Sequence, residues 1–563
     1  MPTISARLSD LGRLAGEPLD RETLDARLVG AKGEAKSLAD SPDDLRIELA
    51  DGNRPDLWSP EGIARQIRSM RRGKPDVYPF FGPGARPAGR IVVDEALRGV
   101  RPFIGGFTVE GFEVTDDGLR GMIEAQEKLC ELFGRRRKAI AIGVYAADRI
   151  AWPIRYRAVA PDARRFVPLG ASEEMDLARI LRDHPTGAKY ADVLKGFSLY
   201  PFLEDAEGRV LSFPPVINSA DVGQVKIGDR RLFVEVTGTD LRQVILCVNI
   251  FAANLADRGG AIAPCEVEYP YDTPLGRSVV TPQDAARGVA VPFSEFERVL
   301  GVPVTAADLK KTFGAYGVRV KTQGKSVVVT PPPWRDDYLH PYDALEDYAI
   351  ARGYAAFEPV PLACFTTGAL DPLTEFGDRA RDLLAGMGFE EVVSNVLTAR
   401  ERLRDRMGLP PGGLVEIENI YSETYSVMRD RLLPSLLEVE AESVKASYPH
   451  RIFEEGDVAV REGSTVKTRR KAAALVAHPD AAFSEAHGFL NLLLYYLDVD
   501  GSIEPADLPG FIPGRAARIR AGGKTIGEIG ELHPAVLEAW GIKNPSVAFE
   551  VDLSALSPTR ALS

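Results

Sequence analysis

The sequence is poor in cysteine, and its few cysteines do not form a recognisable metal or disulfide pattern. Only four occur in 563 residues, and no two of them form a CxxC pair: Cys130, Cys247, Cys265 and Cys364. A zinc ribbon needs cysteines paired at short spacing, so that class of site is excluded. A disulfide-stapled fold is excluded for the same reason, and the pattern is typical of a reducing compartment.

Long apolar runs are also missing. The N-terminal stretch MPTISARLSDLGRLAGEPLD contains acidic residues and no apolar core, so we expect no signal peptide. The most apolar helical stretch, Phe489 to Leu497, is too short to span a bilayer, and we interpret it as a buried core helix. The sequence therefore predicts a cytoplasmic protein with no membrane partner.

Positive charge is in deficit, with 69 Lys and Arg against 81 Asp and Glu and a net charge of −12. Proteins that wrap nucleic acid over a wide surface are usually basic, because neutralising phosphates drives that binding. We expect no DNA partner, and any RNA contact must be local or shared with another chain. Four basic clusters occur, and we interpret each as a solvated charged face in preference to an RNA site: Arg71-Arg72 with Lys74, Arg135 to Lys138, Arg164-Arg165, and Arg469 to Lys471.

The length and composition predict an α+β protein of several domains. With 45% hydrophobic and 27% charged residues, the chain has the composition of ordinary globular protein. Shifts in pattern and Pro/Gly-rich stretches divide it into four predicted parts: an N-terminal α/β domain (1–85), a larger domain of strands and helices (88–275), a winged-helix-like module (285–355) and a C-terminal domain (357–563).

Local signals predict individual elements within these parts. Ser59 followed by Pro60 predicts a helix start. Ser294 to Glu297 and Thr305 to Asp308 both have the form of a capping box, which satisfies free backbone donors at a helix start. A hairpin around Gln323-Gly324 completes the winged-helix-like module. In the last part, short strands separated by long intervals predict a largely antiparallel sheet flanked by helices.

A group of carboxylates follows Trp334. If Pro341 opens a helix, Asp343, Glu346 and Asp347 share one helix face, and Asp337 lies just before it. Grouped carboxylates repel one another unless something compensates, and Mg²⁺ is a natural compensating cation. The spacing alone favours the alternative, an acidic first helical turn that the helix dipole stabilises and whose charges are solvated.

A family resemblance covers nearly the whole chain. Residues 334–354, WRDDYLHPYDALEDYAIARGY, resemble the WRxD…DLxEExARxYGY segment of phenylalanine–tRNA ligase β-subunits. Further stretches are similar to other blocks of that family and follow in the family's order: Asn53–Leu57 with Gly62–Arg65, Val210–Ser219, Val236–Asp240, Arg451–Asp457 and Gly527–Pro534. One such block is a weak signal, but this ordered series is specific. The resemblance is closer to the archaeal and eukaryotic cytosolic type than to the common bacterial one.

The resemblance implies a partner chain and a divided labour. In this family α and β chains form an (αβ)₂ assembly that joins phenylalanine to tRNA(Phe) with ATP and Mg²⁺ (EC 6.1.1.20), and the synthetic active site belongs to the α-subunit. The family's Mg²⁺ ligands in the β chain fall on Asp337, Asp343, Glu346 and Asp347. The module at 285–355 is then B5-type, and the C-terminal domain resembles a class II synthetase fold. Its last strand, Ala548 to Asp552, has no arginine to hold ATP, which implies an inactive domain that supports the α-subunit.

The resemblance also implies a B3/B4-type editing domain at 88–275. A hydrophobic pocket rejects an added hydroxyl by only about a hundredfold, so a second, hydrolytic site is a common remedy against tyrosine. Pocket positions fall on Leu203, Ser212, Glu235 and Thr237, and we expect Glu235 to accept the tyrosine hydroxyl. Spacing alone equally allows Ser212 and Thr237 merely to satisfy backbone groups. No Ser-His-Asp or Cys-His constellation is visible nearby, so we expect water to attack the ester.

Two other functions remain open at this stage. One is a stand-alone hydrolase that clears mischarged tRNA without an α chain, which leaves the large C-terminal domain unexplained. The other is a non-enzymatic adaptor whose winged-helix-like module binds nucleic acid, which the acidic overall balance disfavours.

Overall fold

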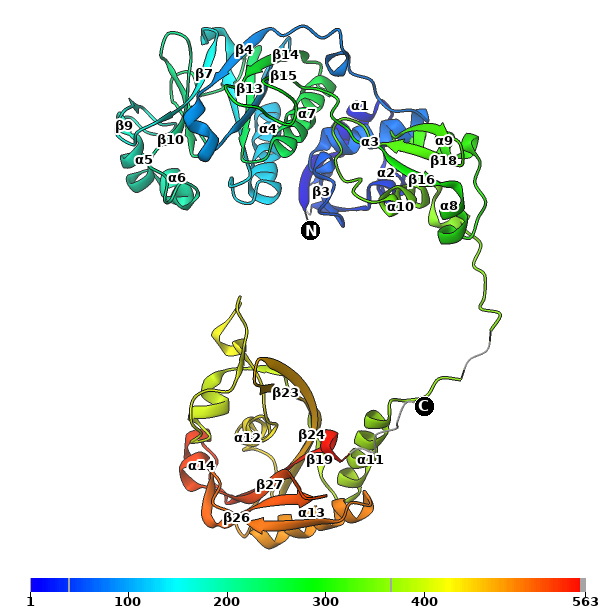
Figure 1. Ribbon diagram of the computed structural model, residues 1–563, viewed down its shortest axis with the longest axis vertical. Helices are drawn as coiled ribbons and strands as arrows, with labels where there is room; N and C mark the ends of the chain where they lie inside the picture. The colour runs from blue at the N-terminus through cyan, green and yellow to red at the C-terminus, as the bar shows by residue number, and fades with distance from the viewer. Residues whose placement is uncertain (1, 39–40, 365–366, 557–563) are drawn as a thin grey trace. The chain divides into compact units, whose positions relative to one another are not determined.

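The computed structural model describes residues 2–38, 41–364 and 367–556. The chain forms two compact units, residues 1–360 and 361–563 (Figure 1). The predicted division of the first unit into three parts stays a prediction. Within the described ranges, no helix is long and apolar enough to cross a membrane.

The first unit begins with a three-stranded antiparallel sheet in the order β1-β3-β2. Its elements are β1 (Thr3–Arg7), α1 (Leu8–Ala15), α2 (Arg21–Leu28), β2 (Gly33–Leu38), β3 (Ser41–Leu49) and α3 (Pro60–Arg72). The predicted start of α3 is confirmed, because the Ser59 hydroxyl accepts the Gly62 N–H at 3.2 Å. A side chain at Gly62 would collide with the Asp56 carbonyl, so glycine there allows close packing of the helix on the preceding turn.

A larger sheet follows, in the order β12-β11-β10-β7-β4-β14-β5-β13-β6, with β15 paired to β14. Most neighbours are antiparallel, but β4 is parallel to both β14 and β7. Its strands are β4 (Gly89–Val93), β5 (Phe103–Glu110), β6 (Ile140–Ala146), β7 (Ile154–Val159), β10 (Tyr200–Glu204), β11 (Val210–Phe213), β12 (Ile217–Asn218), β13 (Arg231–Gly238), β14 (Ala261–Glu268) and β15 (Ser278–Thr281). Its helices are α4 (Asp116–Lys128), α5 (Leu177–Asp183), α6 (Pro185–Tyr190) and α7 (Leu241–Asp257), and β8 (Arg165–Phe166) and β9 (Met175–Asp176) form a separate pair. Helix α7 packs against β5 and β13, and it also contacts α3.

The two ends of this sheet face each other across a short gap. The Tyr145 hydroxyl on β6 lies 2.8 Å from the Ser212 hydroxyl on β11. Asn218 on β12 donates its side-chain N–H to the carbonyl of Val144 at 3.4 Å. These contacts join the strands at opposite ends of the order, so the sheet curls, and its open seam holds the cavity described below.

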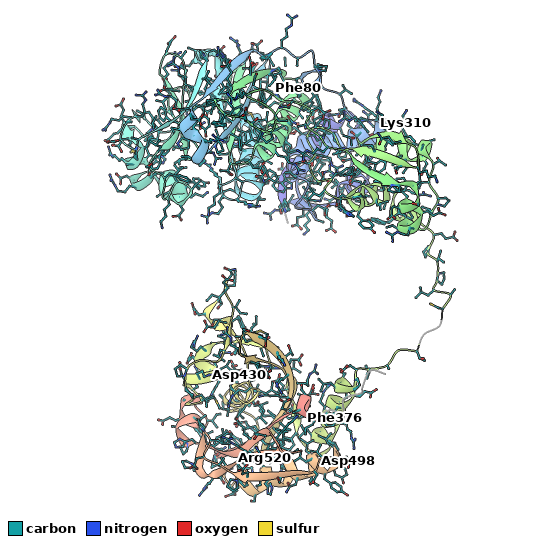
Figure 2. All side chains as sticks on the ribbon, viewed as in Figure 1. Phe80, Lys310, Phe376, Asp430, Asp498 and Arg520 are labelled. Carbon is teal, nitrogen blue, oxygen red and sulfur yellow. The ribbon has the colours of Figure 1, made fainter. Side chains whose placement is uncertain are left out.

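The end of the first unit contains the predicted hairpin, β17 (Arg319–Gln323) with β18 (Ser326–Thr330), and β16 (Val289–Pro292) adds a third strand. Its helices are α8 (Phe293–Leu300), α9 (Ala306–Ala315) and α10 (Pro341–Arg352), and Lys310 lies on α9 (Figure 2). The helix start predicted at Thr305 is confirmed, since its hydroxyl accepts the Asp308 N–H at 3.1 Å, but the reciprocal half of the capping box is not formed, because the Asp308 carboxylate accepts the Tyr348 hydroxyl. The capping box predicted at Ser294 is wrong: β16 leads directly into α8, so Pro292 is the cap and Ser294 lies inside the first turn.

The second unit is built on the predicted, largely antiparallel sheet with flanking helices. The strand order is β19-β23-β24-β28-β27-β26-β25, and only β19 and β23 are parallel. The strands are β19 (Glu390–Glu391), β23 (His450–Glu462), β24 (Thr465–Ala477), β25 (Gly501–Pro505), β26 (Phe511–Ala521), β27 (Lys524–Leu532) and β28 (Ser546–Asp552), and a smaller sheet contains β20 (Leu397–Thr398), β22 (Val427–Met428) and β21 (Val415–Glu416). The helices are α11 (Pro372–Gly386), α12 (Leu433–Glu442), α13 (Phe483–Tyr496) and α14 (Pro534–Trp540). One apolar core includes residues of α11 and α13, and a second includes residues of α12 and α14.

Helix α13 is not the fully buried core helix that its sequence predicts. Leu490 and Leu493 are buried against the sheet. In contrast, Leu492, Tyr495 and Tyr496 are 46%, 75% and 51% exposed. The apolar run predicts burial all round, whereas the helix packs on one side only and leaves an apolar face uncovered within the described residues.

Candidate functional site

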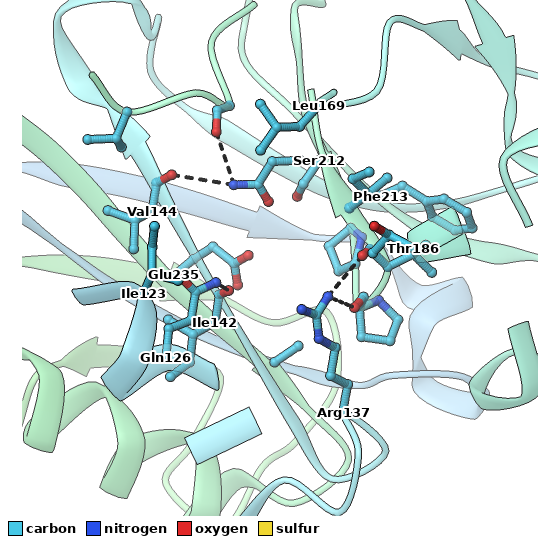
Figure 3. A pocket seen from close by; sticks show the side chains of 18 of the residues that line it. Ile123, Gln126, Arg137, Ile142, Val144, Leu169, Thr186, Ser212, Phe213 and Glu235 are labelled. Carbon is cyan, nitrogen blue, oxygen red and sulfur yellow. Dashed lines mark hydrogen bonds between the residues drawn. The ribbon is translucent and has the colours of Figure 1, made fainter. Parts of the chain in front are cut away.

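A cavity of about 460 Å³ opens at the seam of the curled sheet (Figure 3). Its walls come from α4, β6, β13 and the stretch from β11 to β12. Most of the lining is apolar, for example Met122, Ile142, Val144, Val216 and Ile217. The polar side chains are few: Gln126, Arg137, Thr186, Ser212, Asn218, Gln224 and Glu235, with Glu127 at the same wall. An apolar cavity with a few polar groups is the usual form of a small-molecule site.

Glu235 is the acidic group set deepest in this wall. It lies on β13 directly opposite Gly143 of β6, and its side chain is almost completely buried. One carboxylate oxygen, Oε1, accepts the Tyr145 hydroxyl at 2.9 Å. The other, Oε2, is buried and has no hydrogen-bond partner among the described residues. A buried acceptor without a partner is costly, so Oε2 is the group in this wall that a bound hydroxyl would satisfy.

Gly143 makes room for this arrangement. A Cβ atom at that position would collide with both the Tyr145 hydroxyl and the Glu235 carboxylate. Tyr145 has one proton to donate, and a carboxylate can only accept, so Tyr145 donates to Glu235 and accepts from Ser212. Tyr145 therefore holds Glu235 in one orientation and leaves Oε2 without a partner among the described residues.

Burial raises the pKa of Glu235 to about 7, against the opposing effects of the Tyr145 hydrogen bond and the positive charge of Arg101. A carboxyl group in water at neutral pH is almost fully ionised. Here the protonated and ionised forms exchange near neutrality, which makes the acceptor strength of this group dependent on pH.

Two of the four residues predicted for the pocket line the cavity, and two do not. Ser212 and Glu235 lie in its wall. Leu203 is fully buried on β10, in register with Ser212 but one strand farther from the seam. Thr237 lies behind the wall, where its hydroxyl accepts the Nε–H of Arg101 at 3.0 Å. Leu203 and Thr237 therefore support the site from the core and do not face a ligand.

The sequence prediction did not include Tyr145, Arg101 or Arg137. Tyr145 lies two residues beyond Gly143 in β6, so strand alternation places both on the same face of the sheet. Gly143 lies directly opposite Glu235, so Tyr145 and Glu235 also share that face. Arg101 is only 2% exposed, and it bonds to the Thr237 carbonyl at 2.7 Å and to the carbonyls of Arg137 and Lys138 at 3.2 Å. No local pattern identifies it, because its partners are distant in the sequence.

The predicted carboxylate cluster also comes together. All four predicted residues line one small cavity that also contains Lys32 and Arg54. Each carboxylate already has a partner. Arg335 bonds Asp337 at 2.6 Å and Asp347 at 2.7 Å, and Lys32 bonds Glu346 at 2.5 Å. Asp343 accepts the N–H groups of Leu339 and His340 at 2.7 Å and so caps α10.

This arrangement does not fit a bound divalent cation as it stands, because Arg335 and Lys32 supply the compensating charge. Over the described ranges, no three His, Cys, Asp or Glu side chains are grouped closely enough to hold a metal ion. The assignment of Asp337, Asp343, Glu346 and Asp347 as Mg²⁺ ligands therefore stays a prediction. It requires that Lys32 and Arg335 release these carboxylates.

In the second unit, the last strand carries a carboxylate that stabilises a helix. Glu550 on β28 is buried and accepts the N–H groups of Leu432 and Leu433 at 2.8 and 3.0 Å, at the start of α12. Lys471 bonds its other oxygen at 2.7 Å. A carboxylate at a helix N-terminus is stabilising, and the same negative charge disfavours a triphosphate at this strand.

Two family models match the chain. The model described as "Phenylalanyl tRNA synthetase beta chain CLM domain" matches residues 358–553. The model described as "tRNA synthetase B5 domain" matches residues 289–354, close to the predicted winged-helix-like module.

Curated proteins and a solved structure are similar along most of the chain. The phenylalanine–tRNA ligase β-subunits of Thermococcus kodakarensis and Pyrococcus furiosus are both 38% identical over 99% of this chain, which covers 99% and 100% of those proteins. The β-subunit of Treponema pallidum is 36% identical over 99% of this chain and 100% of its own length. A crystal structure of an N-terminal fragment of the phenylalanyl-tRNA synthetase β-subunit from Pyrococcus horikoshii is 34% identical, with a TM-score of 0.58, and covers 63% of this chain and 100% of that fragment.

Proposed function

This chain belongs to the family of phenylalanine–tRNA ligase β-subunits, and we propose that it also hydrolyses tyrosyl-tRNA(Phe) in the cavity around Glu235. As a β-subunit it takes part in charging tRNA with phenylalanine, the aminoacyl-tRNA ligase reaction EC 6.1.1.20. The observation that carries the editing proposal is the unpartnered Oε2 of Glu235, buried at an otherwise largely apolar wall.

Selectivity follows from that oxygen. A tyrosyl group bound in the cavity with its hydroxyl at Oε2 donates a hydrogen bond to this otherwise unpartnered oxygen. A phenylalanyl group leaves Oε2 buried and unpaired, at a cost of about 1–3 kcal/mol. The cavity therefore favours the mischarged amino acid, which is what an editing site requires.

The hydrolytic step uses water. Breaking the ester transfers the acyl group from the ribose oxygen to a water oxygen, and the proton lost by the water ends on the ribose hydroxyl. The side chains at the cavity bind and orient the amino acid, and Tyr145 fixes Glu235. We assign no nucleophilic side chain, and the free hydroxyl of the terminal ribose is adjacent to the ester on the tRNA itself.

For the charging reaction we propose the family's (αβ)₂ assembly in the cytoplasm. ATP and Mg²⁺ bind at the α-subunit, which supplies the synthetic active site. The buried Glu550 supports this assignment, because it gives the last strand of the second unit a structural role. We propose that the α-subunit packs against the exposed apolar face of α13, which is formed by Leu492, Tyr495 and Tyr496.

The editing proposal is tested by co-expressing the chain with its α-subunit and measuring hydrolysis of tyrosyl-tRNA(Phe) and phenylalanyl-tRNA(Phe) in single turnovers. We expect Glu235→Gln and Glu235→Ala to reduce the preference for the tyrosyl ester by roughly tenfold or more, the value of one hydrogen bond to a charged group. Glu207→Gln is a matched control, since Glu207 is an exposed carboxylate on the same domain. A preference unchanged in both Glu235 variants contradicts the assignment.

A further inference from the structure

The four basic clusters of the sequence differ in what their side chains contact. In three of them, arginines are paired with carboxylates. Arg72 bonds Asp76, Arg164 bonds Glu204 and Arg470 bonds Glu455, at 3.0, 3.4 and 3.0 Å. The fourth cluster, Arg135 to Lys138, differs. The side chains of Arg135, Arg136 and Lys138 are exposed and form no ion pair or hydrogen bond within the described part of the chain.

The backbone of this segment is held in a conformation that arginine rarely adopts. Arg135, Arg136 and Arg137 have φ values of 51°, 56° and 64°, in the left-handed region. Each such residue costs about 1–2 kcal/mol relative to the right-handed conformation, and glycine avoids this cost. Arg135 and Arg136 have no side-chain partner in the described residues and occupy positions that suit glycine, which indicates that their side chains serve a purpose other than stability.

The segment is fixed in place from two sides. The buried Arg101 binds its backbone, by donating to the carbonyls of Arg137 and Lys138. The side chain of Arg137 binds the stretch between β11 and β12, by donating to the carbonyls of Pro215 and Val216 at 3.2 and 2.9 Å, and its guanidinium lies 4.0 Å from the centre of the Tyr190 ring. The exposed charges of Arg135, Arg136 and Lys138 are therefore carried on a rigid backbone.

This rigid segment lies at the editing cavity. Arg137 is itself part of the cavity lining, and Figure 3 shows it around the same space as Ser212 and Glu235. Its carbonyl partners, Pro215 and Val216, belong to the opposite wall of the cavity, in the stretch between β11 and β12. Arg135, Arg136 and Lys138 lie within two residues of Arg137 in the chain, and their exposed side chains are not part of the cavity lining, so they lie on the surface next to the cavity.

We infer that Arg135, Arg136 and Lys138 bind the phosphodiester backbone at the single-stranded 3′ end of the tRNA and so bring the terminal ester into the cavity. An aminoacyl ester in the cavity must be joined to a nucleotide chain that leaves through the entrance. That chain carries one negative charge per phosphate, and uncompensated cations on a rigid backbone are the groups that bind it. The remainder of this acidic chain does not need to be basic for such a local contact.

The inference rests on the proposed editing function for its substrate but is tested separately. The probe is an uncharged acceptor-stem minihelix with a single-stranded 3′ end, because its contacts are limited to that end of the tRNA. The protein is the full chain, compared with a triple variant, Arg135→Gln with Arg136→Gln and Lys138→Gln. Glutamine removes the charges and keeps a polar side chain with the same first two methylene groups.

We expect the triple variant to bind the minihelix about tenfold more weakly at physiological salt, and the slope of log K against log salt to become less steep by about 2, since each phosphate contact on a single strand contributes about 0.7. The matched control is Lys445→Gln with Lys524→Gln and Lys543→Gln. It removes the same charge from three exposed lysines that have no partner in the described residues, and we expect its affinity and slope to equal those of the unmodified chain.

Equal affinities and equal salt slopes for the triple variant and the unmodified chain overturn the inference. An equal loss in the control variant also overturns it, because the effect then reflects net charge and not this surface. If the unmodified chain fails to hydrolyse tyrosyl minihelix but the triple variant still loses affinity, the editing function fails while the RNA contact stands. Circular dichroism of each variant confirms that the fold is retained.

Discussion

At the scale of single residues, the site depends on one carboxylate in an unusual setting. Glu235 is nearly completely buried, with one oxygen bonded to Tyr145 and the other free within the described residues. The structure places Glu235 and Ser212, two of the four positions that the resemblance gives for the pocket, in the wall of one cavity, and their role in editing stays a prediction. The resemblance does not separate them from Leu203 and Thr237, since distance from the seam depends on how the sheet curls.

The pKa of Glu235, about 7, predicts a pH dependence of selectivity. Below pH 7 the carboxyl is mostly protonated and is a weaker acceptor, and above it the carboxylate accepts the tyrosine hydroxyl in a charge-assisted bond. We expect the ratio of tyrosyl to phenylalanyl ester hydrolysis to rise about fivefold between pH 6 and pH 8, from about 1 kcal/mol of added hydrogen-bond strength. The measurement is single-turnover hydrolysis across this range.

Glu235→Gln is the control for this dependence, since an amide does not titrate. Its ratio of hydrolysis rates should be flat over the same pH range. A ratio that falls with rising pH in the unmodified chain, or a rise that persists in the variant, would show that another group is responsible.

At the scale of elements, most starts and ends follow from local signals, but not all. Ser59 and Thr305 cap their helices as the sequence predicts, because the cap bond involves residues three positions apart. Ser294 does not, since the preceding strand continues to Pro292 and places the cap of α8 two residues before the predicted position. The left-handed segment formed by Arg135, Arg136 and Arg137 has no local sequence signal, because none of these residues is glycine.

Because that segment is strained, replacing one of its arginines by glycine should make the first unit more stable and weaken its binding of the minihelix. Arg136→Gly should raise the free energy of unfolding of the first unit by roughly 0.5–1 kcal/mol, because glycine adopts the observed φ of 56° without a steric cost. The same variant should bind the minihelix more weakly. Lys138→Gly is a matched control that loses the same charge without a left-handed φ to relieve, so it should not gain stability. Denaturant unfolding that shows no gain for Arg136→Gly would mean that the segment is not strained.

The carboxylate cluster at α10 predicts how the chain responds to metal. Lys32 compensates the negative charges of Glu346 and Asp51, which it contacts at 2.5 and 2.6 Å. About 5 mM Mg²⁺ should therefore leave the melting temperature of the unmodified chain unchanged. Lys32→Ala leaves both carboxylates uncompensated, and Mg²⁺ should then raise its melting temperature.

Lys36→Ala is the comparison for this experiment, because Lys36 pairs with Glu48 on an exposed strand and away from the cluster. It should show no response to Mg²⁺. A melting temperature of the unmodified chain that falls on addition of a chelator would instead support direct Mg²⁺ binding by Asp337, Asp343, Glu346 and Asp347.

At the scale of the whole molecule, the two units each have their own buried cores. We therefore expect residues 1–360 and 361–563, expressed separately, to fold and to unfold cooperatively. Calorimetry of each fragment against the full chain checks this. A fragment that is unfolded on its own would mean that its core depends on the other unit.

The arrangement of the larger sheet is the part of the fold that the sequence does not predict. Short apolar segments such as Ile140–Ala146 are recognisable as strands, but their order in the sheet is set by pairings between distant residues. The seam that brings Tyr145 to Ser212 joins residues 67 positions apart. The cavity is therefore a property of the assembled sheet and of no single segment.

We propose that this chain removes tyrosine from tRNA(Phe) through Glu235. The most direct test supplies the assembled ligase with tyrosine, ATP and tRNA(Phe) and follows both ATP consumption and tyrosyl-tRNA(Phe). With the unmodified chain, we predict that ATP is consumed while tyrosyl-tRNA(Phe) stays low, and that Glu235→Gln lets it accumulate. Equal, low levels with both chains, or accumulation with the unmodified chain, would contradict the editing role of Glu235.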